Sequence, residues 1–129
     1  MILLPHAPSF GDPNLAAAIE RLSPDEIDAL PYGAIHVDQE GVVQFYSKAE
    51  RRLSGSGERP RTGLAFFTRI APCMDNDAFR GRIERAAQAG KLDIAFIHIG
   101  DFEDDERELS VRIQSAAGGG FWIFMSREP

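Results

Sequence analysis

The chain has 129 residues, of which 43% are hydrophobic and 26% charged, and its formal net charge at pH 7 is −6. This length suits one domain with one core, and the composition excludes disordered and fibrous proteins. The excess of acidic residues argues against nucleic acid as a partner, because nucleic acid binding relies on Lys and Arg to neutralise phosphates.

The first part of the chain predicts surface structure and short helices. The apolar run 1–4 is too short for a signal peptide or a membrane span, so we expect a cytoplasmic chain without membrane insertion. Segment 5–13 contains three prolines and should cross the surface, as a lid, without regular structure. A helix is expected over 14–22, where apolar residues recur at helical spacing. The sequence Ser23-Pro24-Asp25-Glu26 then predicts the start of a second short helix.

The middle of the chain begins with a predicted β-hairpin over 33–47, in which alternating apolar residues flank the turn 38–41. A short helix should follow over 48–53 and stop at the flexible Ser/Gly sequence 54–57. A short apolar piece, 64–70, leads towards the single cysteine.

The second half predicts one long helix and three strands. Acidic residues and an asparagine open the helix, which should run over 75–89 and end at a glycine. Strands are expected over 94–102 and 109–116, separated by the acidic turn 103–106, and a last strand over 121–126.

Two strands, then helices, then three sequential strands predict an α+β fold in which helices flank a five-stranded antiparallel sheet. This order is PAS-like. We expect one domain over 1–129, with 1–28 as an N-terminal cap of short helices and 29–129 as the PAS core. Such a fold hosts cofactor binding, ligand binding and protein contact alike, so it leaves the function open.

Motifs for catalysis are lacking. The histidines, His6, His36 and His98, lie far apart in the sequence, and we expect no metal site. Nucleotide-binding glycine motifs and a nucleophile elbow are absent from the sequence, so we expect no enzyme. A single cysteine excludes an intramolecular disulfide and a multi-cysteine metal site.

Cys73 follows Pro72 and precedes an acidic helix start, where backbone N–H groups and the helix dipole favour a thiolate. Taken alone, a lone cysteine between apolar residues is more often a buried structural thiol. Tyr46 and Glu50 are spaced to meet on one side of the chain. The alternative for Glu50 is a solvated glutamate beside the basic pair 51–52.

Several short sequences along the chain share the order and spacing of one known family. They are Tyr32-Gly33-Ala34-Ile35, Phe45-Tyr46, Glu50, Ser54-Gly55, Phe66-Phe67, Ala71-Pro72-Cys73 and Phe121-Trp122-Ile123-Phe124. In these features the chain resembles the photoactive yellow proteins, PAS-type blue-light receptors used in sensory transduction. The resemblance covers about 19–127, and its most specific part combines Tyr46, Glu50 and Ser54 with Ala71-Pro72-Cys73.

The resemblance implies a 4-hydroxycinnamic acid (p-coumaric acid) chromophore joined to Cys73 by a thioester. Its phenolate would accept hydrogen bonds from Tyr46 and from a protonated Glu50, with the Ser54 hydroxyl bracing the tyrosine. Nothing in the neighbouring sequence guarantees a buried cation that would ionise Glu50. The other residues expected to contact the chromophore are Ile35, Phe66, Ile70, Ala71 and Pro72.

The resemblance also implies a mechanism. Light isomerises the chromophore, Glu50 gives a proton to the phenolate, and an uncompensated charge in the core favours partial unfolding. The N-terminal cap, with its thin core, should loosen first and so act as the signal.

Two features depart from the family's usual pattern. Ser56 stands where an arginine is common, and whether Arg52, Arg59 or Arg61 replaces that arginine stays open. The segment 100–104 replaces an aromatic and methionine loop.

Other readings also stay open. The alternative function is a PAS-type interaction or ligand-binding domain without a covalent pigment, in which Cys73 is inert and Glu50 exposed. The chain could stand alone or be the N-terminal photoreceptor domain of a phytochrome-related sensor histidine kinase. Its partner would accordingly be a downstream signalling protein or a fused kinase module, and a homodimer is compatible with either case.

Overall fold

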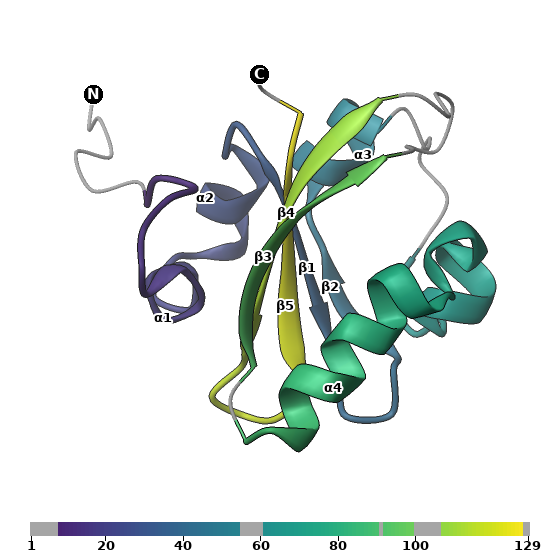
Figure 1. The fold of residues 1–129 in the computed structure, drawn as a ribbon. Coiled ribbons are helices and arrows are strands. Elements are labelled where there is room, and N and C mark those ends of the chain that lie inside the picture. The colour runs from purple at the N-terminus through teal and green to yellow at the C-terminus, as the bar shows by residue number, and fades with distance from the viewer. Residues whose placement is uncertain (1–7, 55–60, 91, 100–106, 128–129) are drawn as a thin grey trace, which may run out of the picture.

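The computed structural model describes residues 8–54, 61–90, 92–99 and 107–127 (Figure 1). The expected loops 54–57, 100–104 and 103–106, and the start of the expected lid, lie partly or wholly outside these ranges. The α-helices are α1 (Leu15–Ile19), α2 (Pro24–Asp28), α3 (Lys48–Ser54) and α4 (Arg82–Gln88). The strands are β1 (Gly33–Val37), β2 (Val43–Tyr46), β3 (Asp93–Ile99), β4 (Glu108–Ser115) and β5 (Phe121–Ser126).

The strands form one five-stranded sheet in the order β2-β1-β5-β4-β3, and every neighbouring pair is antiparallel. This confirms the predicted α+β, PAS-like fold. Figure 1 shows α4 on one side of the sheet and α1 and α2 on the other. The N-terminal helices therefore cover a different face from the helix that follows the cysteine.

Successive side chains along the central strands point to opposite faces of the sheet, so the buried residues form two clusters. On β5, Ile123 and Met125 belong to one cluster, whereas Trp122 and Phe124 belong to the other. The inner cluster, on the side of α4, contains Ile35, Val37, Val43, Tyr46, Phe66, Phe67, Ile70, Ala71, Met74, Phe79, Ile83, Leu92, Leu109, Val111, Ile113, Ile123 and Met125. The cap cluster contains Leu15, Ala16, Ile19, Ile27, Leu30, Tyr32, Ala34, Trp122 and Phe124.

Local signals placed the short elements correctly. Ser23 forms a complete capping box with Glu26 at the start of α2. In the β1–β2 hairpin, the Asp38 carboxylate accepts from the backbone N–H groups of Glu40 and Val42, at 2.8 and 3.0 Å. Gly41 has a φ of 85°, which a glycine adopts without strain.

The long helix predicted over 75–89 consists of two parts in the structure. Its first part is a π-helical turn, η3 (Asp77–Gly81), and α4 begins only at Arg82. The Asn76 side chain accepts from the Phe79 N–H at 3.0 Å, and the Gly81 N–H reaches the Asn76 carbonyl at 3.1 Å, five residues back. The wider turn accompanies complete burial of the Phe79 ring. The apolar piece 64–70 likewise contains a π-helical turn, η1 (Phe66–Ile70).

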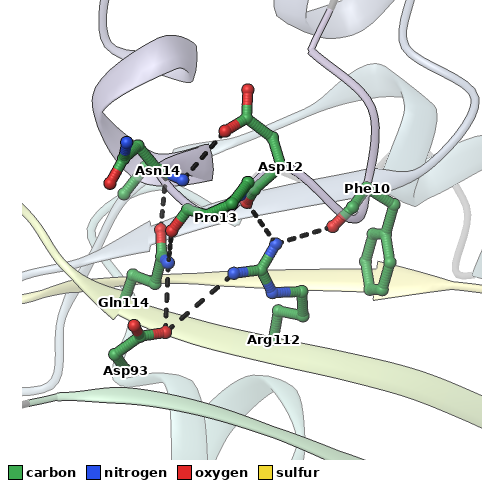
Figure 2. Close-up of polar contacts among 8 residues, drawn as sticks. Phe10, Asp12, Pro13, Asn14, Asp93, Arg112 and Gln114 are labelled. Atoms are coloured by element: carbon green, nitrogen blue, oxygen red, sulfur yellow. Dashed lines mark hydrogen bonds and ion pairs between the residues drawn. The ribbon is translucent and has the colours of Figure 1, made fainter.

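Two polar side chains of β4 attach the N-terminal segment to the sheet (Figure 2). The Arg112 guanidinium donates to the carbonyls of Phe10 and Asp12, at 2.8 and 2.6 Å. The Gln114 amide donates to the Pro13 carbonyl at 2.9 Å. These bonds join residues about 100 positions apart in the chain, so contacts with the sheet help to fix the segment before α1.

Tyr32 also holds the N-terminal segment, and because its hydroxyl can ionise, this contact depends on pH. Its hydroxyl donates to the Pro8 carbonyl at 2.6 Å. Burial, helped by the nearby Asp12 charge and opposed by Arg112, raises the pKa of Tyr32 from 10.0 to about 12. The folded state therefore holds the phenolic proton more tightly than the unfolded state.

We expect the stability contributed by Tyr32 to be complete below pH 10 and to be lost as the pH rises towards 12. Two pKa units correspond to a loss of at most about 2.7 kcal/mol. Urea unfolding over this range should show a steeper decline for the wild type than for Tyr32→Phe, which keeps the ring but cannot ionise. Equal declines would contradict the assignment.

Candidate functional site

The junction between β2 and α3 places three of the expected site residues inside the protein. The Ser47 hydroxyl accepts from the backbone N–H of Glu50, at 3.0 Å, and of Ala34 on β1, at 3.1 Å. These bonds fix the first turn of α3 against β1. Glu50 is 0% exposed, Ser54 5% and Tyr46 6%, so the reading of Glu50 as a solvated glutamate is wrong.

Four of the expected apolar contact residues share the inner cluster with Tyr46, and each is at most 5% exposed. They are Ile35, Phe66, Ile70 and Ala71. Pro72, the fifth, is exposed. Most of the predicted lining thus belongs to the same core cluster as Tyr46, although these residues come from β1, from η1 and from the position after η1.

Cys73 lies on a 3₁₀ turn, η2 (Pro72–Met74), directly beside this cluster. Its neighbours Ala71 and Met74 are buried, whereas Cys73 itself is exposed. The Asn76 amide donates to the Cys73 carbonyl at 2.9 Å and so fixes the end of the turn. The reading of Cys73 as a buried structural thiol is therefore wrong, and the sulfur is accessible to a reagent.

The Glu50 carboxylate has a partner that sequence reasoning missed. Arg127 donates from both terminal guanidinium nitrogens to the two carboxylate oxygens, at 2.7 and 2.8 Å. The Arg127 side chain is 2% exposed and that of Glu50 is 0% exposed. A guanidinium has only donors, so two parallel bonds of this kind fit an ionised carboxylate.

Gly33 makes this ion pair sterically possible. A Cβ atom on Gly33 would clash with Oε1 of Glu50, so any larger residue would displace the carboxylate from this position. Gly33 begins β1 and pairs with Met125 of β5. The same strand pairing brings Arg127, just after β5, towards α3.

Two further arginines lie near the site. The guanidinium carbons of Arg51 and Arg61 lie 5.8 and 5.9 Å from the centre of the Tyr46 ring. Arg52 instead reaches the Leu30 carbonyl at 3.4 Å, and Arg59 is outside the described residues. Of the three arginines considered for the position of Ser56, Arg61 is thus the one seen beside Tyr46.

The described part of the chain holds no group of three His, Cys, Asp or Glu residues that could bind a metal ion. Within the same residues, the helices are too short or too polar to cross a bilayer.

Comparison with known proteins identifies the family. A photoactive yellow protein from Rhodothalassium salexigens is 32% identical over 119 residues, which are 92% of this chain and 95% of that protein. The chain belongs to the photoactive yellow protein family. Members of this family are photoreceptors rather than enzymes, and they normally carry a p-coumaric acid chromophore.

Solved structures agree with this assignment. The photoactive yellow protein domain of the sensor histidine kinase Ppr from Rhodospirillum centenum is 38% identical, with a TM-score of 0.75 over 85% of this chain and 97% of that one. A RsLOV structure, 15% identical, has a TM-score of 0.53 over 77% of this chain and 61% of its own, and shows the fold alone. No family model matches the chain.

The described residues fit a photoactive yellow protein chromophore in part. An accessible thiol stands next to an apolar cluster that contains a tyrosine, as an aromatic acyl group requires. The geometry of the Glu50 carboxylate does not match the expected role of proton donor, because both of its oxygens accept from Arg127, as the oxygens of an ionised carboxylate do.

Proposed function

We propose that this chain is a blue-light photoreceptor domain whose 4-hydroxycinnamoyl chromophore is joined to Cys73 by a thioester. The observation that carries the proposal is the exposed Cys73 thiol on a turn that borders the inner cluster, in a chain of the photoactive yellow protein family. When bound, the chromophore supplies the light-driven isomerisation of a double bond.

Attachment requires only acyl transfer. The Cys73 sulfur forms a bond to the carbonyl carbon of an activated 4-hydroxycinnamate, the bond to the activating group breaks, and the thiol proton leaves with that group. No electrons are exchanged with an oxidant or a reductant. Cys73 is the one cysteine of the chain, so the acceptor is unambiguous.

The roles that the family resemblance suggests for the other residues are supported by their chemistry and burial. Tyr46 can donate its hydroxyl proton in a hydrogen bond, and Ser54, which is equally buried, braces it. Short bonds from hydroxyl donors stabilise a buried phenolate, which would otherwise be costly. The buried apolar residues Ile35, Phe66, Ile70 and Ala71 exclude water from this site, and Pro72, which is exposed, would contact the chromophore at its edge.

Glu50 is the proposed proton donor. It is completely buried on the first turn of α3, four residues after Tyr46. Donation requires a protonated carboxyl, and in the ion pair with Arg127 the carboxylate has the geometry of an ionised group. The role therefore requires Glu50 to exist in two states, one paired with Arg127 and one protonated.

The N-terminal cap is the proposed output element. We assign 1–28 to the cap and 29–129 to the PAS core, because α1 and α2 pack on the face of the sheet opposite the inner cluster. The cap buries few large side chains and depends on polar contacts from Arg112 and Gln114 (Figure 2). Elements of this kind open at low free energy.

The relative in Ppr is part of a sensor histidine kinase, and we propose a signalling partner of that kind here.

The alternative function, an interaction or ligand-binding PAS domain without a covalent pigment, has one observation in its favour. The Glu50–Arg127 pair already satisfies both carboxylate oxygens without a pigment.

Light-dependent colour distinguishes the two functions. Protein reconstituted with activated 4-hydroxycinnamic acid should absorb visible light, bleach on blue illumination and recover in the dark. Infrared difference spectra should then show a protonated-carboxyl band that bleaches in the wild type and is missing in Glu50→Gln. Glu84→Gln, at an exposed position on α4, is the matched control and should keep the band. A reconstituted protein without a visible, light-sensitive band would favour the alternative.

A further inference from the structure

We propose that Arg127 is a positioning residue that holds Glu50 ionised in the pigment-free chain and thereby couples the protonation state of Glu50 to the end of β5. The pair joins two side chains of this chain. Its consequence for light sensing rests on the proposed function, since only that function requires Glu50 to become protonated.

The geometry supports a specific pair rather than a chance surface contact. Two guanidinium nitrogens meet two carboxylate oxygens at 2.7 and 2.8 Å, and the two side chains are 2% and 0% exposed. Exposed pairs in the same chain, such as Arg85 with Asp77, make a single short bond. Bidentate, water-excluded pairs fix both the charge and the orientation of a carboxylate.

The other charges on α3 also favour the ionised form of Glu50. The other charged residues of α3 are Lys48, Arg51 and Arg52, which are all cationic. Asp28 of α2 faces α3 but accepts from the backbone N–H of Lys48, at 2.8 Å. On β1, the adjacent residue is Gly33, which brings no charge. Removal of Arg127 would leave a buried carboxyl group whose neutral form is favoured by desolvation.

The pair provides a route from the site to the C-terminal side of the sheet. Arg127 follows Ser126, the last residue of β5, and β5 lies between β1 and β4 in the sheet. A protonated Glu50 would attract the guanidinium only weakly, so the end of β5 would lose its anchor on α3. Gain and loss of one proton at Glu50 therefore correspond to two states of Arg127 at the end of β5. This differs from the implied mechanism, in which the carboxylate left after proton transfer has no partner.

The test uses the pigment-free full chain at neutral pH. Infrared spectra should show no protonated-carboxyl band that depends on Glu50 in the wild type. Arg127→Gln should gain such a band, equivalent to one group, and the double variant Arg127→Gln/Glu50→Gln should lose it. Arg127→Lys keeps the positive charge and should keep Glu50 ionised. Arg85→Gln, at the exposed pair with Asp77, should match the wild type.

Hydrogen exchange provides a second measurement on the same proteins. Amides at the end of β5 and the start of β1 should exchange at least tenfold faster in Arg127→Gln than in Arg85→Gln. A Glu50-dependent protonated band in the wild type, or no such band in a folded Arg127→Gln, overturns the proposal. If Arg127→Gln does not fold, loss of the ionised state in Arg127→Lys overturns it and its retention supports it. None of these results depends on chromophore attachment, so failure here leaves the proposed function standing.

Discussion

Glu50→Ala should lower the free energy of unfolding of the pigment-free chain by about 3–5 kcal/mol, because removing one partner of a buried ion pair leaves the other charge poorly compensated. The Arg127 guanidinium would lose a carboxylate that it contacts at 2.7 and 2.8 Å, in a place where its own side chain is 2% exposed. Urea unfolding followed by circular dichroism measures this loss.

Two comparisons make the result specific. The double variant Glu50→Gln/Arg127→Met removes both charges and should recover a large part of the stability, since apolar or neutral replacements of a buried pair are often tolerated. Asp77→Ala breaks the exposed pair with Arg85 and should cost no more than about 1 kcal/mol. If Glu50→Ala costs as little as Asp77→Ala, the buried pair does not hold α3 to the end of β5.

The sequence predicted the elements that local chemistry controls. The hairpin over 33–47, the helix start at Ser23 and the strand 121–126 all depend on residues within a few positions of one another, and the structure confirms them. The five-stranded sheet followed from the number and order of these segments.

The π-helical turns could not be read from the sequence. Asp75–Asn76–Asp77 has the composition of an ordinary helix start, and the wide turn appears together with the packing of the Phe79 ring against Phe67 and Phe96. Such packing depends on residues brought together by the whole fold. The helix expected over 14–22 is also shorter, and it ends at Ile19. Beyond this point the backbone N–H groups of Arg21 and Leu22 donate to carbonyls only three residues back, which does not continue an α-helix.

For the candidate site, the structure agrees with the expected burial of three residues but adds a charged partner that the sequence did not predict. Burial of Tyr46, Glu50 and Ser54 agrees with their resemblance to the family. Arg127 was missed because it lies 77 residues from Glu50 and meets it only through the pairing of β1 with β5. One clue was present: a glycine at 33, opposite a strand that is followed directly by an arginine, leaves room for a buried carboxylate.

Cys73→Ala should abolish chromophore attachment completely, which is the largest functional effect we expect. The chain has no second cysteine, and a hydroxyl or methyl group cannot replace a thiolate in this acyl transfer. Since Cys73 is exposed and its side chain is not part of the inner cluster, the substitution should change the free energy of unfolding by about 0.5 kcal/mol or less. Ser54→Ala, which leaves the thiol intact, is the control and should still be labelled.

The central claim is tested most directly by mass spectrometry of the protein after reconstitution with activated 4-hydroxycinnamic acid. We predict one added 4-hydroxycinnamoyl group in the wild type and in Ser54→Ala, located by proteolysis on the peptide that contains Cys73 and removed by hydroxylamine, which cleaves thioesters. Cys73→Ala should gain no mass. A wild-type protein that gains no adduct, or a Cys73→Ala variant that gains the same adduct, would contradict the account.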